Sequence, residues 1–141
     1  MSTANVQLIQ SFEDRFVAGD LDYVLSILTD DIVVHEPANV PYPGNHRGKE
    51  SFLKLAQAFG KVWDLQGPLD LDIMPAGDDR VLVLVRGDAI AKPTGNNFEL
   101  RIAEIYTIRD GKISDIVVHY WDTAEIVEVT NGVKVLQGDR N

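Results

Sequence analysis

Two long segments of alternating polarity, joined by a two-residue turn, constrain the fold of this chain more than any other feature. They are NNFELRIAEIYTIR and KISDIVVHYW, and both are rich in β-branched and aromatic residues, as strands are. Asp110-Gly111 between them is a preferred pair for the tight turn of a β-hairpin. Two more apolar segments, PLDLDIMPAG and RVLVLVRGDAIAK, precede them, so the second half of the chain predicts an antiparallel meander. Since RVLVLVRGDAIAK is almost wholly apolar, we expect both of its faces to be covered.

The first half of the chain shows the period of helices instead. Apolar residues recur at helical spacing from Thr3 to Ala18 and again from Leu21 to Leu28, where Asp20 suits the N-cap of a second helix. DIVVHEP then reads as a short strand, and a third amphipathic helix is expected from about Lys49 to Asp64. WDTAEIVEV reads as a short closing helix or turn, and residues 130–141 as an edge strand or a loose tail.

Helices followed by a meander predict an α+β fold in which three N-terminal helices pack on a strongly curved, mostly antiparallel sheet. Such a sheet, wrapped over helices, encloses an apolar pocket with the inward strand faces as its floor and the helices as its walls, and we expect a ligand to bind there. The chain has 141 residues, of which 45% are hydrophobic, and this is enough for one core. Residues 1–141 are therefore predicted to form a single domain.

The composition excludes several classes of function. The chain has no cysteine, which excludes disulfides, thiol catalysis and thiolate metal sites. The net charge is −9 and the basic residues form no stripe, so we expect no nucleic-acid partner and favour a small apolar or weakly polar ligand. The amino terminus lacks the pattern of a signal peptide, and no apolar run is long enough to cross a membrane. A cytoplasmic protein without a membrane partner is expected.

Glu104 is the one charged residue on an otherwise apolar strand face. Residues two apart share a face of a strand, so Glu104 lies with Ile102 and Tyr106. A carboxylate on such a face is costly unless it is paired or protonated. Two interpretations stay open, namely a neutral Glu104 that donates a hydrogen bond to a ligand oxygen, or a structural ion pair with Arg86 or Arg101.

Two other strands also carry polar residues that could line a pocket. Arg86 and Asp88 share one face of their strand and could pair directly, either in the pocket or at the open, solvated end of the sheet. Gly87 between them predicts a bulge or the close approach of another element. On the last strand His119 and Trp121 share a face, which suits a pocket wall, although a histidine among apolar residues is more often a hydrogen-bonded core residue.

The strand DIVVHEP ends on two ionisable residues, His35 and Glu36. Alternation directs them to opposite faces of the sheet, so only one of them can line a pocket. His46 follows in a proline-containing loop, where we expect it to be exposed to solvent. None of the spacings typical of metal-binding histidines occurs, so no metal site is predicted.

Three stretches carry family motifs: AGDLDYVLSILTDDIVVHEP, PYPGNHRGKESFLKLAQAF and EIYTIRDGKISDIVVHYWDTAEI. Together they resemble the SnoaL-like branch of the nuclear transport factor 2-like superfamily, which includes ketosteroid isomerase-related proteins and polyketide cyclases. The resemblance extends to about Val129. It implies a cone of curved sheet around a pocket, three helices that close it, and a homodimer. It does not settle activity, because the superfamily contains both enzymes and binding proteins.

The resemblance to ketosteroid isomerases implies a proton-transfer site. Glu36, directly before Pro37, takes the place of the family's general base, and Glu104 falls at or next to the place of its protonated oxyanion-hole aspartate. A carboxylate that removes a proton next to a carbonyl, with a neutral acid that stabilises the enolate, needs no cofactor. Phe12 stands where the family has an oxyanion tyrosine.

The chain also resembles the limonene epoxide hydrolases: Arg86-Gly87-Asp88 is similar to their Arg-x-Asp pair, with His119 in place of their final aspartate. Three hypotheses follow: an isomerase- or cyclase-like enzyme that uses acid–base catalysis, a non-catalytic ligand-binding protein, and an epoxide hydrolase-like enzyme. The expected catalytic residues are Glu36, Glu104, His119 and His35. The expected substrate-binding residues are Phe12, Phe16, Trp63, Arg86, Asp88, Tyr106 and Trp121.

Overall fold

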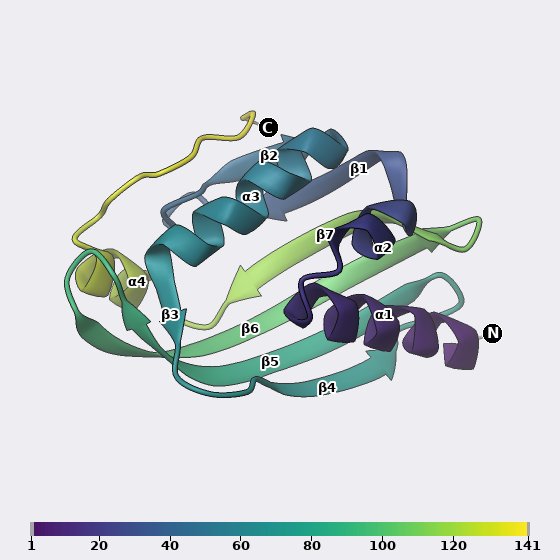
Figure 1. Cartoon of the computed structure of the whole chain (residues 1–141), viewed down its shortest axis with the longest axis horizontal. Coiled ribbons are helices and arrows are strands. Elements are labelled where there is room, and N and C mark those ends of the chain that lie inside the picture. The colour runs from purple at the N-terminus through teal and green to yellow at the C-terminus, as the bar shows by residue number, and fades with distance from the viewer. Residues whose placement is uncertain (1, 141) are drawn as a thin grey trace.

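The computed structural model describes residues 2–140, without the side chain of Ser2, and this range forms four helices and seven strands (Figure 1). In chain order they are α1 (Ser2–Val17), α2 (Leu21–Ser26), β1 (Leu28–Glu36), β2 (Gly44–Arg47), α3 (Gly48–Val62), β3 (Trp63–Leu65), β4 (Asp70–Pro75), β5 (Arg80–Ala91), β6 (Asn96–Arg109), β7 (Lys112–Tyr120) and α4 (Thr123–Thr130). The predicted α+β class is confirmed. The sequence does not indicate the short strands β2 and β3.

Capping residues mark the end of α1 and the start of α2. Gly19, with a φ of 78°, follows α1 in the left-handed conformation that ends a helix. The Asp20 side chain accepts a hydrogen bond from the backbone N–H of Tyr23 at 3.3 Å, which confirms Asp20 as the N-cap of α2. α2 ends earlier than the apolar pattern predicts, because Leu28 pairs with Ile113 in the sheet. No helix within residues 2–140 has the length and apolar character needed to span a membrane.

One sheet joins the seven strands in the order β2-β1-β7-β6-β5-β3, with β4 also paired to β5. The meander from β4 to β7 is antiparallel, as the sequence predicts. Asp110 and Gly111 turn between β6 and β7 with φ values of 53° and 75°, as the tight hairpin turn requires. β1 runs parallel to β7, because the chain between them makes the long crossover that parallel neighbours need.

The sheet is strongly curled, and α1 and α3 lie on its concave side (Figure 1). α3 packs on β1 and β2, and α1 packs on β4 and β5. The register between β6 and β7 shifts between Thr107 and Ile108. Because of this irregularity, Ile113 and Ile116 both point into the core, although simple alternation would put Ile113 on the outer face with Asp115.

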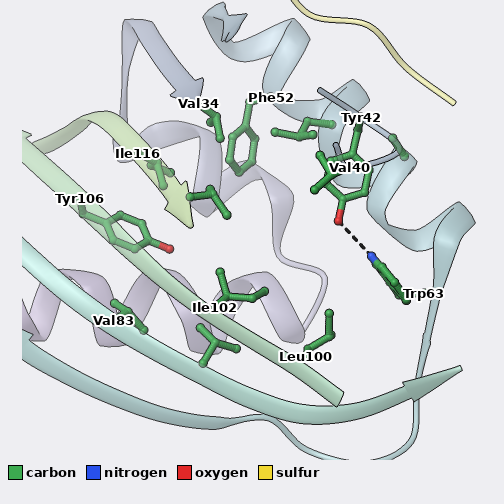
Figure 2. Packing of buried hydrophobic residues seen from close by; sticks show 14 of the residues in the cluster. Val34, Val40, Tyr42, Phe52, Trp63, Val83, Leu100, Ile102, Tyr106 and Ile116 are labelled. Carbon is green, nitrogen blue, oxygen red and sulfur yellow. Dashed lines mark hydrogen bonds between the residues drawn. The ribbon is translucent and has the colours of Figure 1, made fainter. Parts of the chain in front are cut away.

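The core fills the space between the concave face and the helices. Figure 2 shows Val83, Leu100 and Ile102 from β5 and β6 facing Val40 and Tyr42 across this space. An aromatic group from α1, α3 and β6 packs beside them, with ring centroids 5.7–6.2 Å apart: Phe12, Phe16, Phe52 and Tyr106. The interior of the cone is therefore mainly apolar, and the ligand pocket expected there stays a prediction.

β5 has one covered face, so the prediction that both of its faces are covered is wrong. Val83 and Val85 are buried on the concave side, whereas Leu84 between them is 43% exposed on the convex side. Gly87 marks the close approach that the sequence predicts rather than a bulge. The pairing of β5 with β6 continues through it without a shift, and a Cβ there would overlap the side chain of Leu69.

The C-terminal residues 133–140 lie along the loop that precedes β2, so this segment is neither a regular strand nor a loose tail. The backbone N–H of Gly138 donates to the Pro43 carbonyl oxygen at 2.8 Å. Asn45 and Asp139 exchange two backbone hydrogen bonds of 2.8 Å. A Cβ on Gly138 would lie 2.7 Å from the Asn45 carbonyl oxygen, so glycine permits this close contact.

Candidate active site

The end of β1 decides which of two neighbouring ionisable residues reaches the interior. Val34 is buried in the core, so alternation turns Glu36 inward and His35 outward. On the outer side, Nε2 of His35 lies 2.7 Å from Oδ1 of Asp115, and Nδ1 lies 2.7 Å from Oδ1 of Asn45. Of these two predicted catalytic residues, Glu36 belongs to the interior and His35 to the outer face.

Glu36 lies in surroundings that oppose its ionisation. Its Oε1 is buried and has no hydrogen-bond partner within the described residues. Burial, aided by the negative charge of Glu104, holds the pKa of Glu36 well above its usual range. Because an unpaired buried carboxylate oxygen is costly, this atom is available to a proton, a water molecule or a ligand.

A second acidic group lies on β6. The hydroxyl oxygen of Tyr106 is 3.0 Å from Oε1 of Glu104 and 2.8 Å from Oε1 of Glu13, which α1 contributes. Burial raises the pKa of Glu104 to about 8, the charge of Glu13 adds to the effect, and the hydrogen bond from Tyr106 opposes it. Burial also raises the pKa of Glu13. Glu104 is therefore mostly a neutral acid at pH 7.

Three more polar side chains meet on the other side of the interior. The hydroxyl oxygens of Tyr42 and Tyr120 are 2.6 Å apart. The indole N–H of Trp63 donates to the Tyr42 oxygen at 2.9 Å, as Figure 2 shows. The tyrosine pair uses one of its two hydroxyl protons internally and leaves the other for a partner outside this group. Burial raises the pKa of both tyrosines, and the charge of Glu36 raises each further. Both hydroxyls therefore stay protonated at neutral pH.

The proline-containing loop before β2 positions Tyr42. Pro41 and Pro43 flank this residue and restrict the backbone, so a loop without regular structure holds a ring that is 0% exposed. Nε2 of His46 lies 2.9 Å from the Tyr42 carbonyl oxygen. His46 is buried, so its predicted exposure to solvent is wrong. The reason is that His46 lies on β2 opposite the buried Val34, and α3 packs on this strand.

Four of the predicted site residues lie on the convex face of the sheet, outside the interior: Arg86, Asp88, His119 and Trp121. Alternation along β5 buries the valines and turns Arg86 and Asp88 outward. Nε of Arg86 lies 3.7 Å from Oε2 of Glu99 on β6, so the predicted pairing of Arg86 with Asp88 is wrong. The predicted ion pair of Glu104 with an arginine is also wrong, because Glu104 lies on the opposite face and contacts Tyr106.

A surface depression of about 690 Å³ lies on this convex face. Its lining includes Leu84, His119 and Trp121, which is 73% exposed and stacks against the Arg101 guanidinium at 4.5 Å. The three interior carboxyls do not line it. We place the candidate site with those carboxyls, because acids with shifted pKa values in apolar surroundings are typical of catalytic centres. The residues of the hydrolase hypothesis thus lie on an open face.

The other four predicted substrate-binding residues belong to the interior: Phe12, Phe16, Trp63 and Tyr106. Trp63 stacks on Phe98 with ring centroids 4.9 Å apart, and the Phe12 ring lies edge-on to Tyr106 at 5.7 Å. These rings provide large apolar contact surfaces beside the polar groups. The interior therefore combines aromatic walls with a few acids and hydroxyls, as small-molecule sites do.

The interior carboxyls belong to residues that are less completely buried than their apolar neighbours. Glu13, Glu36 and Glu104 are half-buried, whereas Ile102 and Tyr106, which flank Glu104 on its strand face, are buried. A half-buried carboxyl with apolar neighbours can exchange a proton with a bound ligand. Within residues 2–140, no group of three or more His, Asp or Glu side chains could hold a metal ion.

Three interior residues lie outside the sequence-based prediction: Glu13, Tyr42 and Tyr120. Glu13 follows Ile9 by four positions and precedes Phe16 by three, so it shares the apolar face of α1, and this spacing is a usable signal. Tyr120 lies on the buried face of β7, which alternation also indicates. Tyr42 stands in a loop, where no periodicity indicates its direction.

A strongly curled sheet whose concave face carries helices is the cone fold of the NTF2-like proteins. Within this class, residues 9–116 match the SnoaL-like domain, and the chain belongs to the SnoaL-like family. The predicted family and fold are thereby confirmed. A search of curated protein sequences finds no match to the chain.

Solved structures of this fold resemble the chain over most of its length. An NTF2-like protein from Burkholderia xenovorans is 26% identical with a TM-score of 0.80, over 93% of this chain and 98% of that one. A Mesorhizobium loti protein, provisionally described as a SnoaL-like polyketide cyclase, is 21% identical with a TM-score of 0.69, over 85% and 100% of the two chains. A Bacillus subtilis protein, provisionally described as an isomerase, is 15% identical with a TM-score of 0.72, over 91% and 93%.

Proposed function

We propose that the chain catalyses cofactor-free acid–base proton transfer on a small apolar carbonyl compound bound in the cone interior, as an isomerase, cyclase or dehydratase does. The observation that carries this proposal is the pair of interior carboxyls, Glu36 on β1 and Glu104 on β6, whose pKa values burial raises in the same apolar core. Two acids in different local environments can take complementary roles in one reaction.

Glu36 is the proposed base. When it is ionised, its apolar surroundings stabilise the charge poorly, so it is a stronger proton acceptor than an exposed glutamate. Its unpaired Oε1 takes the proton from the carbon next to the substrate carbonyl. The electron pair of the broken C–H bond moves toward the carbonyl oxygen and forms an enolate.

Glu104 is the proposed acid. In its neutral form it donates a hydrogen bond to the enolate oxygen, and it does so in a water-poor site where such a bond is strong. Return of the proton to another carbon gives isomerisation, and attack of the enolate on a second carbonyl gives cyclisation. Activity requires the protonation state in which Glu36 is ionised and Glu104 is neutral. Because the pKa values of both acids are raised, only a fraction of the molecules is in this state at pH 7, and we expect a bell-shaped pH profile.

The interior suits an apolar substrate with few polar groups. Phe12 and Trp63 offer aromatic faces, and the hydroxyl proton that the Tyr42–Tyr120 pair does not use can hold a second polar atom. The provisional descriptions of the two neighbours, polyketide cyclase and isomerase, agree with this chemistry. We further propose that the chain forms a homodimer, which the family resemblance favours.

Hydrogen–deuterium exchange at carbon tests the proposal even when the final product is unknown. The protein is incubated in deuterated water with a panel of enolisable ketones, and α-deuteration is followed by mass spectrometry. We expect Glu36→Gln and Glu104→Leu to lose about 10²- to 10⁴-fold of the exchange rate. Glu104→Gln, which keeps a neutral N–H donor, should lose less. Glu128→Gln, the same change at an exposed position of α4, is the control. Unchanged rates in Glu36→Gln and Glu104→Leu would refute both assignments.

A non-catalytic ligand-binding protein is the second candidate. The observation that favours it is Phe12, an apolar ring packed against Tyr106 where ketosteroid isomerases have a tyrosine donor. This candidate predicts saturable binding of an apolar ligand, detected by quenching of Trp63 fluorescence, without deuterium exchange. Binding that is accompanied by exchange would reject it in favour of the enzyme.

A further inference from the structure

Two carboxyls share the hydroxyl group of Tyr106. The phenol oxygen lies 2.8 Å from Oε1 of Glu13 and 3.0 Å from Oε1 of Glu104, and both are hydrogen-bonding distances. Tyr106 points from β6 into the core (Figure 2), and its ring is 2% exposed. Glu13 reaches it from α1, so the triad joins a helix to the sheet.

Counting protons shows that this triad cannot hold two carboxylates. A phenol has one proton, which can satisfy one of the two carboxylate oxygens. The second oxygen would then face the phenol oxygen with no proton between them, and this contact is repulsive in a low-dielectric core. One of the carboxyls must therefore carry a proton and donate it to Tyr106. Because the phenol can donate to either carboxyl, the extra proton can lie at either end without movement of a heavier atom.

The acidic and phenolic groups around the triad favour retention of this proton. Asp14, the neighbour of Glu13 on α1, raises the pKa of Glu13. The charges of Glu36 on β1 and Glu104 on β6 repel each other. The phenols of Tyr42 and Tyr120 are also within the field of Glu104, and burial keeps them uncharged. Each negative charge in this set makes a further ionisation in the interior less favourable.

We propose that Glu13 is a positioning residue for the acid: through Tyr106 it keeps one extra proton on the buried carboxyl pair. When a ligand binds, Glu104 turns this proton from the phenol oxygen to the ligand oxygen, while Tyr106 donates to Glu13. The role of Glu104 toward a ligand rests on the proposed function. The shared proton does not, because it follows from the geometry of the ligand-free protein. The two parts can therefore fail separately.

The test is a titration of the glutamate carboxyl carbons by ¹³C NMR in the ligand-free full chain. In the wild type we expect Glu104 to titrate with a midpoint of about 8. Glu13→Gln removes the negative charge and keeps a hydrogen-bonding group for Tyr106, so the midpoint should fall by about one pH unit or more. Glu128→Gln is the matched control and should leave it unchanged.

Tyr106→Phe separates this role from loosening of the core. The hydrogen bond from Tyr106 lowers the pKa of Glu104, so its loss should move the midpoint upward, opposite to the effect of Glu13→Gln. General loosening would move both variants down toward 4.5, the ordinary value. A wild-type Glu104 that titrates near 4.5, or a midpoint that Glu13→Gln does not move, would overturn the proposal. If these midpoints behave as expected and no ketone exchanges, the proposed function fails and the shared proton stands.

Discussion

The buried carboxyl of Glu104 should make the stability of this protein fall as the pH rises. Its pKa is about 8 in the folded state and 4.5 as the ordinary value of a glutamate in an unfolded chain. The folded state therefore holds the proton more tightly than the unfolded state does. For a carboxyl with a raised folded pKa, the stabilisation is complete below pH 4.5 and is lost as the pH rises to about 8. Above that pH no further loss comes from this residue.

The size of the effect follows from the distance between the two pKa values. A separation of about 3.5 pH units corresponds to about 5 kcal/mol, as an order of magnitude. This is a large part of the roughly 5–15 kcal/mol that stabilises a typical domain. Exposed carboxyls affect stability in a different pH range. Arg109 lowers the pKa of Asp31, so the contribution of Asp31 to the free energy of unfolding is lost only at acidic pH. The contribution of Glu104 therefore falls within the interval from about pH 5 to pH 9, and comparison with a variant that lacks this carboxyl separates it from other groups.

Urea denaturation at fixed ionic strength, repeated at intervals across that range, measures this dependence. We expect the free energy of unfolding of the wild type to fall across the interval, and that of Glu104→Gln to change much less, because an amide does not titrate. The difference between the wild type and Glu104→Gln in the pH dependence of the free energy of unfolding includes the electrostatic coupling of Glu104 with Glu13 and Glu36. Glu128→Gln should keep the wild-type slope. Parallel curves for the wild type and Glu104→Gln would refute the reasoning.

Three further outcomes are expected. Tyr42→Phe removes the acceptor of the Trp63 N–H and should cost about 1–3 kcal/mol in urea denaturation; no loss would mean that the pair adds nothing to stability. Gly138→Ala places a methyl group 2.7 Å from the Asn45 carbonyl oxygen and should speed exchange of the amide hydrogens of Asn45 and Asp139, which bond the C-terminal residues to β2. Gly60→Ala, which has open space, should not change it, and equal exchange in both variants would reject this attachment of the C-terminal residues. Asp88→Asn and His119→Asn should each keep the exchange rate of the wild type within about twofold, because both residues lie on the convex face; a large loss in either would move the site to that face.

Local patterns in the sequence determined the elements and their faces. The Asp110-Gly111 turn specified the last hairpin, because few pairs adopt its backbone conformation. Asp20 and Gly19 determined the junction between the first two helices through capping and a left-handed φ. The strand period of two placed His35 and Glu36 on opposite faces, and it singled out Glu104 on an apolar face. Each of these features depends on neighbours within a few residues.

Only the tertiary structure decided which face points inward and what gathers there. Alternation groups Arg86 with Asp88, but the packing of the helices on the other side of the sheet turned both outward. Glu13 and Glu104 are 91 positions apart in the chain, and the packing of α1 on the sheet brings both carboxyls to the Tyr106 hydroxyl. Tyr42 is held inside because the C-terminal residues cover its loop, which no local pattern encodes.

The same division explains the chemistry of the candidate site. The sequence by itself determined that acidic residues occur on apolar faces, since this needs only the residue types and the strand period. The shift in the pKa of Glu104 depends on burial and on a second carboxyl from a distant helix. Desolvation and charge repulsion act through space, so they appear only when the chain has folded and brought these groups into one interior.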